Sequence, residues 1–132
     1  MKAEAKQVVI DFLTAVQVHK REKAASLLHP AIEWHQPGNN ALSGIKKNLD
    51  EVIQMGMDMG SIAEQSIELS EIKVLAENGG TIACLLHWMA NPPSGKVFEV
   101  DNIDVYEVAD GKIVRAKVYS ADIAKEDRFW KK

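Results

Sequence analysis

The spacing of hydrophobic residues divides the chain into a helical first half and a second half made of strands. In the first half, apolar residues recur every three or four positions, which is the period of an amphipathic helix. The predicted helices cover residues 3–18, 22–28 and 44–56. A strand is expected over residues 31–36, between the second and third helices, and the Pro-Gly-Asn-Asn segment after it predicts a loop.

The second half alternates apolar and polar residues with the period of two that is typical of strands. The predicted strands cover residues 67–74, 81–89, 97–108 and 112–119, and a short helix is expected over 121–130. The alternation changes phase near Ser70 and Glu71, which predicts a β-bulge there. This order of elements predicts a single α+β domain over residues 1–132, in which a curved, mostly antiparallel sheet wraps the long first helix and leaves a cavity.

A β-hairpin over residues 97–119 carries the strongest functional candidate. Its turn is Asp110-Gly111, a pair that accepts the positive φ angles of a tight hairpin turn. Because strand side chains alternate, one face of the first strand carries Phe98, Val100, Asn102, Asp104 and Tyr106. The second strand presents a small apolar face, formed by Val114, Ala116 and Val118. A carboxylate among such neighbours is unfavourable unless it is paired or kept protonated, so we expect Asp104 to have a raised pKa and a functional role.

The opposite face of the hairpin mixes large apolar residues with charges of both signs. Its apolar members are Ile103, Val105, Ile113 and Tyr119, and its charged members are Glu99, Asp101, Glu107, Arg115 and Lys117. A sheet face that is exposed only to water is normally more polar than this one. Charges of both signs on one face allow a two-fold axis to pair opposite charges of two copies. The pattern predicts a homodimer formed through this outer face. The alternative is a monomer whose own tail, with Phe129 and Trp130, covers the face.

Composition narrows the classes of partner. The net charge of −3 gives no basic excess for nucleic acid, and no apolar run approaches the roughly 18 residues that span a bilayer. The N-terminus lacks the apolar core of a signal peptide. The single cysteine, Cys84, suits a reducing compartment, and together these features predict a cytoplasmic location. Glu33 and His35 share a strand face without a third ligand at metal-binding spacing, and phosphate-binding loops are absent from the sequence, so neither a metal nor a cofactor is predicted.

Two histidines are candidates for a general base, because histidine titrates near neutral pH. His35 alternates with Trp34 and Gln36, so it faces the cavity only if the turn that follows rotates the end of the strand. His87 lies in a central strand beside Trp88. There it either makes a structural hydrogen bond or joins Asp104 as an acid–base pair. Both alternatives stay open for each histidine.

Several segments resemble SnoaL-like, ketosteroid-isomerase-related proteins of the nuclear transport factor 2-like superfamily. The matching residues are Trp34-His35-Gln36-Pro37-Gly38, Asp104-Val105-Tyr106, Asp110-Gly111-Lys112-Ile113, Asp122 and Phe129-Trp130. The resemblance covers nearly the whole chain and implies a cystatin-like, cone-shaped α+β barrel. It is less specific for activity, because this superfamily holds isomerases, cyclases, dehydratases, epoxide hydrolases and many non-enzymes.

The resemblance to steroid isomerases carries over in part. It implies that Asp104 stands where those enzymes hold a protonated aspartic acid on a late strand. Gln36 stands at the position of their general base, and Phe12 at that of a helix tyrosine. Glutamine does not take a proton at neutral pH and phenylalanine does not donate one, so ordinary ketosteroid isomerase chemistry is not implied at these two positions.

Two functions follow as hypotheses. The first is a cofactor-independent isomerase, cyclase or dehydratase that binds a hydrophobic carbonyl compound, with Asp104 donating to a developing enolate and His35 or His87 moving a proton. The second is a non-catalytic module that binds a hydrophobic ligand or acts as a dimeric scaffold, with Asp104 paired to Asn102 or Tyr106. In either case the expected cavity lining is Phe12, Val16, Trp34, Gln36, Val100, Asn102, Asp104, Tyr106, Ala116 and Val118.

Overall fold

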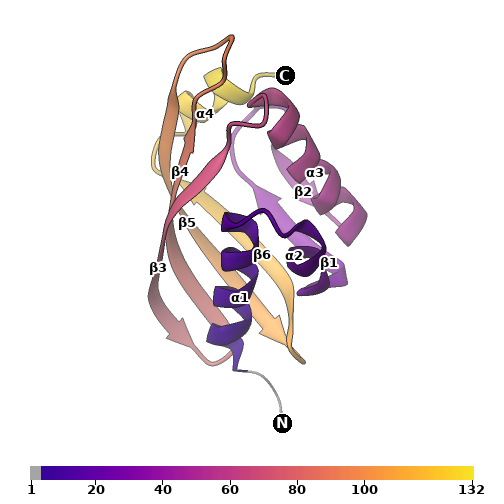
Figure 1. Cartoon of the computed structure of the whole chain (residues 1–132). Helices are drawn as coiled ribbons and strands as arrows, with labels where there is room; N and C mark the ends of the chain where they lie inside the picture. Colours follow the sequence, from indigo (N-terminus) through magenta and orange to yellow (C-terminus); the bar gives the residue numbers. More distant parts are fainter. Residues whose placement is uncertain (1–3) are drawn as a thin grey trace.

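A computed structural model describes residues 4–132 and shows one strongly curved sheet packed against helices (Figure 1). The helices are α1 (Ala5–Gln17), α2 (Arg21–Ser26), α3 (Leu49–Ile62) and α4 (Ile123–Trp130). The strands are β1 (Leu28–Gln36), β2 (Gly44–Lys46), β3 (Glu68–Asn78), β4 (Thr81–Ala90), β5 (Phe98–Ala109) and β6 (Lys112–Ser120). Residue 3, where the first helix was expected to begin, lies outside the described residues.

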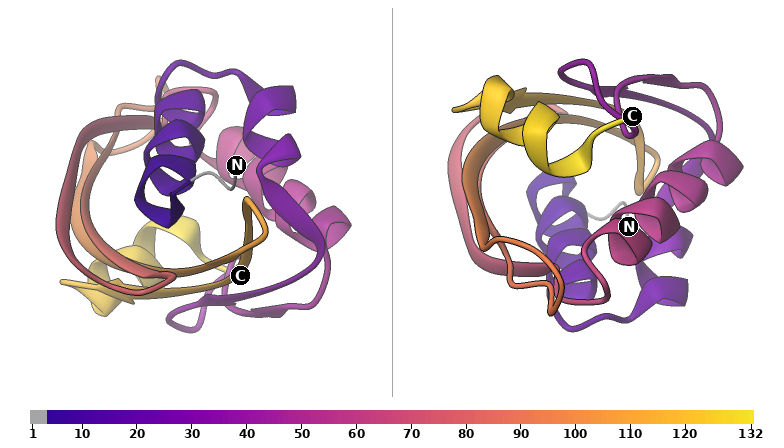
Figure 2. Two further views of the ribbon diagram at one scale, coloured as in Figure 1. Left: turned by 90° about the horizontal axis from the view of Figure 1, so that it is seen from below. Right: turned by 90° about the horizontal axis from the view of Figure 1, so that it is seen from above.

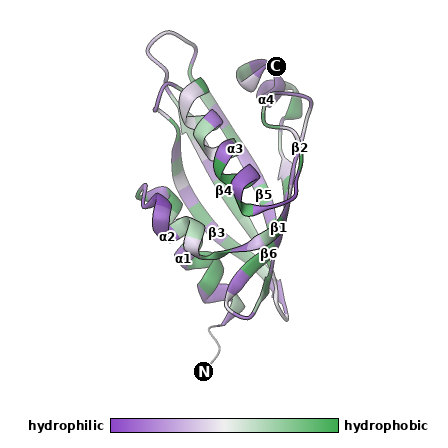
Figure 3. Ribbon diagram, turned by 90° about the vertical axis from the view of Figure 1, so that its right-hand side faces the viewer, coloured by the Kyte–Doolittle hydropathy of each residue, from purple (hydrophilic) through white to green (hydrophobic). Residues whose placement is uncertain are grey.

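The six strands form one sheet in the order β2-β1-β6-β5-β4-β3. Neighbouring strands are antiparallel except β1 and β6, which are parallel. Figure 2 shows α1 lying inside the curve of the sheet, α2 and α3 on its open side, and α4 across one end. In Figure 3, which looks onto that open side, hydrophobic residues alternate with hydrophilic ones along the strands. The arrangement confirms the predicted α+β fold with a curved sheet around the first helix.

The β5–β6 hairpin places the predicted candidate face toward the helices. Asp110 and Gly111 have φ angles of 51° and 78°, which a two-residue turn between twisted strands requires. In the register of this hairpin, Asp104 pairs with Val118 and Tyr106 with Ala116. The buried positions alternate as predicted and are Phe98, Val100, Asn102, Asp104 and Tyr106.

A bulge in the same hairpin overturns one prediction. Glu107 pairs with Arg115, but the next residue, Val108, pairs with Ile113, which leaves Val114 as an extra residue. An extra residue reverses the alternation of side chains that follow it. Ile113 is therefore fully buried, whereas the sequence placed it on the outer face, and Val114 is only half-buried.

The third helix also differs from its prediction. Residues 44–46 pair with β1 as the short strand β2, and the helix begins only after Asn48. The Asn48 side chain caps the helix by accepting a hydrogen bond from the backbone N–H of Glu51 at 2.9 Å. The phase change near Ser70 is confirmed as a register shift in the β3–β4 pair.

The C-terminal helix α4 closes one end of the sheet and is held there by the loop after β1. Asp127 Oδ1 accepts hydrogen bonds from the backbone N–H of Asn39 and from Asn40 Nδ2, each at 2.8 Å. Gly38, at φ +88°, lets the loop approach, because a Cβ there would lie 2.5 Å from the same oxygen. The Pro-Gly-Asn-Asn loop is thus the docking site of the last helix.

Two aromatic residues of α4 pack on the inner face of the sheet. Phe129 stacks on Phe98 with ring centroids 4.3 Å apart, and Trp130 meets Phe98 edge-on at 5.5 Å. Because Phe98 belongs to the buried face of β5, the alternative in which these aromatics cover the outer face is wrong. Within residues 4–132, every helix falls short of the length and hydrophobicity needed to span a bilayer.

Candidate functional site

A cavity of about 460 Å³ lies between the inner face of the sheet and the helices. Its volume is in the range of small-molecule sites. Most of the exposed residues of its lining belong to α2 and α3, so the cavity opens between these helices. They are Arg21, Glu22, Ile53, Gly56 and Met57, and the other two, His19 and Gln65, lie in the chain just before α2 and just after α3. The predicted residues that line it are Phe12, Val16, Trp34, Gln36, Val100, Asn102, Asp104, Tyr106 and Val118. Ala116 is fully buried but lies outside the lining.

Three aromatic rings from different elements pack against one another in the wall of the cavity. Phe12, Trp34 and Tyr106 meet edge to face, with centroid distances of 6.0 to 6.3 Å. The Trp34 indole N–H donates to Gln36 Oε1 at 2.9 Å. Edge-to-face packing fixes each ring in one orientation. The Gln36 side chain therefore holds the Trp34 ring in place. This is a structural role, whereas a general base at this position would be a carboxylate.

Asp104 and Tyr106 form a buried pair at the cavity. The Tyr106 hydroxyl donates to Asp104 Oδ2 at 2.6 Å, and Asp104 is only 4% exposed. The second oxygen, Asp104 Oδ1, has no hydrogen-bond partner among the described residues. A buried polar atom without a partner is unfavourable, and in a cavity wall it indicates a place for a ligand group.

Burial decides the protonation of this pair. Loss of water raises the pKa of Asp104 to about 7; the Tyr106 hydrogen bond opposes the rise and the charge of Glu126 adds to it. Burial, reinforced by Asp104, raises the pKa of Tyr106 well above its ordinary value, so Tyr106 remains a donor. Near neutral pH, Asp104 is therefore present in both its acid and its carboxylate form.

Glu126 is a second buried carboxyl group in the lining, and the sequence analysis did not identify it. It is 5% exposed, and its Oε2 atom lacks a hydrogen-bond partner in the described part of the chain. Burial raises its pKa, while the Ser120 hydroxyl and the Trp130 indole N–H oppose the rise. The indole N–H is near enough to act on this carboxyl but lacks the geometry of a hydrogen bond. The signal available in the sequence was the four-residue spacing to Trp130, which puts both on one helix face.

Asn102 completes the set of unpaired oxygens at this end of the cavity. Its side chain is buried two residues before Asp104 on the same face of β5. Its Oδ1 atom has no partner within residues 4–132. Of the two partners considered for Asp104, the structure therefore shows Tyr106 and not Asn102.

His35 lies on the outer face of the sheet, not in the cavity as one alternative had it. Strand alternation continues to the end of β1, so His35 faces away from Trp34 and Gln36. Its Nε2 atom lies 3.0 Å from Glu33 Oε2, and this hydrogen bond lowers the pKa of Glu33.

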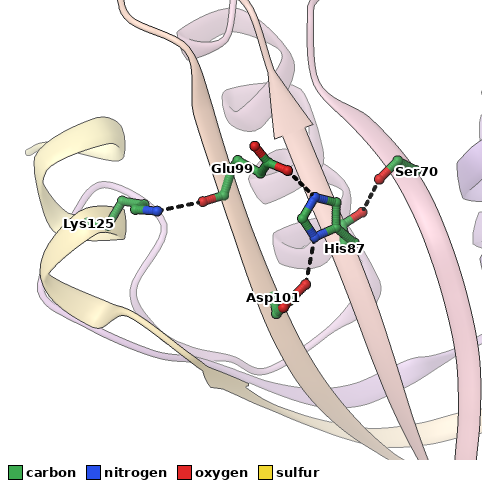
Figure 4. Close-up of polar contacts among 5 residues, drawn as sticks. All are labelled: Ser70, His87, Glu99, Asp101 and Lys125. Carbon is green, nitrogen blue, oxygen red and sulfur yellow. Dashed lines mark hydrogen bonds and ion pairs between the residues drawn. The ribbon is translucent and has the colours of Figure 1, made fainter.

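His87 also faces outward, where two carboxylates hold its ring (Figure 4). Nδ1 lies 2.6 Å from Asp101 Oδ1, and Nε2 lies 2.7 Å from Glu99 Oε1. The hydrogen bond to Asp101, followed by that to Glu99, raises the pKa of His87. The proposed pairing of His87 with Asp104 is wrong, because Asp104 projects from the opposite face of the sheet. Across residues 4–132, no group of three or more His, Cys, Asp or Glu side chains has the arrangement of a metal site.

Comparison with known proteins identifies similar sequences and folds. Residues 9–116 match the family model of the SnoaL-like domain. An uncharacterised protein of Mycobacterium tuberculosis is 28% identical over 101 residues, which is 76% of each chain. A protein of unknown function with a cystatin-like fold from Xanthomonas campestris has a TM-score of 0.92 and 26% identity, over 98% of this chain and 100% of its own.

A second similar structure is TerC, which was co-crystallised with polyporic acid. It has a TM-score of 0.83 and 15% identity, and the match covers 96% of this chain and 98% of TerC. At this identity the likeness concerns the fold alone. Together with the Xanthomonas protein it confirms the predicted cystatin-like fold.

Proposed function

Since the chain belongs to the family of the SnoaL-like domain, we propose that it is an enzyme that acts without a cofactor, by acid–base chemistry, on a hydrophobic carbonyl compound. The observation that carries this proposal is the buried Asp104 carboxyl group, which has one oxygen held by Tyr106 and the other without a partner in residues 4–132. With a pKa of about 7, Asp104 is able near neutral pH to donate a hydrogen bond as the acid and to accept one as the carboxylate.

The pair supports a specific role for Asp104. Because Oδ2 accepts the Tyr106 hydrogen bond, the proton of the neutral acid is carried by Oδ1, the oxygen that has no partner among the described residues. A carbonyl oxygen bound there gains negative charge as the compound enolises. A donor fixed in an apolar cavity stabilises that charge far more than water does.

The lining supports a hydrophobic compound as the ligand. Aromatic and aliphatic side chains from α1, α3 and the sheet surround the carboxyl groups. TerC, which has a similar fold, was co-crystallised with polyporic acid, and this supports a small-molecule ligand for the present chain.

A second candidate is a non-catalytic module that binds a hydrophobic ligand. It is favoured by the hydrogen bond between Asp104 and Tyr106, which gives the carboxyl group a partner without any ligand. It is also favoured by Gln36, which binds Trp34 and stands where the steroid isomerases carry their base.

A turnover assay separates the two functions. Steroids, polyketides and small enones are first screened by thermal shift, and β,γ-unsaturated ketones are then followed by the absorbance of the conjugated enone. The proposal expects Asp104→Leu to lower kcat by about 10² to 10³, the effect of removing one oxyanion donor. Asp101→Leu, on the opposite face of the same strand, is the control and is expected to keep full activity. Binding by the wild type without turnover of any ketone would favour the non-catalytic module.

We also propose that two copies of the chain associate through the outer face of the sheet. Ile103 and Tyr119 pair directly across β5 and β6 and are 40% and 49% exposed. Lys117 lies beside them and Asp101 nearby, so a two-fold axis is able to bring opposite charges together. Ile113, which is buried, no longer belongs to this face.

Ile103→Lys is expected to halve the mass measured by light scattering, because it buries an ammonium group in the interface. Val18→Lys, at another exposed apolar position just after α1, serves as the control and is expected to leave the dimer intact. A wild type with the mass of one chain at micromolar concentration rules this interface out.

A further inference from the structure

With His35 and His87 on the outer face, the cavity retains few groups that are able to take a proton. In the described part of the chain, the titratable members of the lining are His19, Arg21, Glu22, Asp104, Tyr106 and Glu126. The first three are exposed at the mouth, and the Tyr106 hydroxyl already donates a hydrogen bond to Asp104. Glu126 is the remaining buried group beside Asp104.

We propose that Glu126 is a catalytic residue of this cavity, the base that takes a proton from the carbon next to the carbonyl of a bound enolisable ketone. This inference rests on the proposed function and narrows its substrate class to ketones with an acidic C–H. In this arrangement the ketone oxygen lies at Asp104 Oδ1 and the C–H points toward α4.

The location of Glu126 follows from the strand register and the helix that carries it. Ser120 pairs with Asn102 at the end of β6, and its hydroxyl lies near the Glu126 carboxyl. Asn102 is two residues from Asp104 on the same face of β5, so the two carboxyl groups lie at the same end of the cavity. Each has one buried oxygen for which residues 4–132 supply no partner, Asp104 Oδ1 and Glu126 Oε2.

The surroundings of the two groups make one an acid and the other a base. Burial raises the pKa of Glu126, but the Ser120 O–H and the Trp130 N–H oppose that rise because both stabilise the charged form. Asp104, in contrast, pairs with the apolar Val118 across the hairpin, and within residues 4–132 Tyr106 is its one hydrogen-bond donor. The charge of Glu126 raises the pKa of Asp104, so an ionised Glu126 helps to keep the proton on Asp104. Two carboxyl groups whose surroundings separate their proton affinities have the division of roles that acid–base catalysis needs.

The reaction step balances without any further reactant. Glu126 Oε2 takes the proton, the C–H electron pair becomes a carbon–carbon π bond, and the carbonyl π pair moves to the oxygen, which accepts the hydrogen bond of Asp104. When the ketone is β,γ-unsaturated, this enolate is a dienolate. The carbonyl then re-forms, the first carbon–carbon π pair moves between the α and β carbons, and the γ carbon uses the second π pair to take the proton back from Glu126. The double bond has then moved, and both carboxyl groups have returned to their starting states.

The anchoring of α4 supports a fixed position for this base. The next residue, Asp127, accepts hydrogen bonds from the loop after β1. Asp122 Oδ1 caps the helix by accepting a hydrogen bond from the backbone N–H of Lys125 at 3.0 Å. Phe129 and Trp130 pack on Phe98. Groups carried by a helix pinned at several points keep the geometry that proton transfer requires.

The test uses the isosteric Glu126→Gln, which keeps the shape and removes the base. We expect kcat on a β,γ-unsaturated ketone to fall by about 10² to 10⁴, with little change in the Kd for the same ketone measured by thermal shift. Glu126→Asp, which keeps a carboxylate on a shorter side chain, is expected to recover part of the rate. Glu77→Gln, at an exposed position of β3 outside the cavity lining, is the control and is expected to leave the rate unchanged.

A second readout does not depend on turnover. The carboxyl carbon of Asp104 is titrated by nuclear magnetic resonance in the wild type and in Glu126→Gln, and loss of the Glu126 charge is expected to lower the midpoint. An unchanged midpoint, or full activity of Glu126→Gln beside an active wild type, overturns the role of Glu126 and leaves the proposed function standing. A wild type that turns over no ketone overturns the proposed function, and the catalytic role of Glu126 with it.

Discussion

Asp104→Asn is expected to raise the free energy of unfolding by about 4 kcal/mol at pH 8 and to leave it nearly unchanged at pH 3. The native protein holds the Asp104 proton up to a pKa of about 7, whereas the ordinary pKa of an aspartic acid is 3.8. Between these values the unfolded chain releases the proton first, so wild-type stability falls as the pH rises and then levels off above pH 7. Asparagine has the same shape and does not ionise.

Guanidinium unfolding at pH 3, 5 and 8 measures this effect for both proteins. Asp50→Asn serves as the control, because Asp50 lies exposed in the first turn of α3. Asp50→Asn is expected to lower the free energy of unfolding by less than about 1 kcal/mol, because a negative charge interacts favourably with the helix dipole, and to give no increase at high pH. A constant difference between Asp104→Asn and the wild type at all three pH values would show that Asp104 ionises as an ordinary surface carboxylate.

This gain in stability is expected to accompany a loss of activity. A buried ionisable group that has to change its charge in the native state weakens the fold at the pH where it works. Under the proposed function, Asp104→Asn is thus a more stable and slower protein, which is the usual relation at a functional site.

Gly38→Ala is expected to destabilise the protein by about 2 to 4 kcal/mol, one of the larger effects available outside the core. The residue has φ +88°, and a Cβ would lie 2.5 Å from Asp127 Oδ1 and 2.9 Å from Asn40 Nδ2. Alanine therefore adds backbone strain and also separates α4 from its docking loop. Chemical denaturation gives the stability.

Gly111→Ala is a matched control for the backbone strain. Gly111 has φ +78° in the β5–β6 turn, with nothing within 4 Å of its added Cβ, so it is expected to lose only about 1 to 2 kcal/mol. The difference between the two variants isolates the contact with Asp127. Equal losses at both positions would mean that the loop and α4 move apart without a measurable effect on stability.

The buried face of a strand could be predicted from the sequence where apolar and polar residues alternate without interruption. From Phe98 to Tyr106 the period of two is unbroken, and the buried face of β5 follows from it directly. The same rule failed at Ile113, because one extra residue at Val114 reverses the faces and leaves no local mark in the sequence. His35 followed the plain alternation of β1, and no rotation at the turn brings it into the cavity.

Glu126 illustrates what local patterns do not contain. Its place in the cavity depends on where α4 docks, and that is decided by Asp127 and its partners 87 and 88 residues earlier in the chain. The amphipathic face shared with Trp130 predicts that Glu126 meets something apolar, but not which surface. Helix and strand identities are local properties of a sequence, whereas the composition of a cavity is set by tertiary contacts.

The parallel pairing of β1 with β6 has a consequence for the order of folding. Glu33 and His35 of β1 lie beside Arg115 and Lys117, so one of the first strands to be made pairs with the last. Chains are synthesised from the N-terminus, and contacts between distant residues form slowly. While the ribosome is still adding the hairpin, the edge of β1 and the apolar face of α1 remain uncovered, and such edges promote aggregation. The nascent chain is therefore the species most in need of chaperone protection, and it becomes able to bind a ligand only after its last helix has been released.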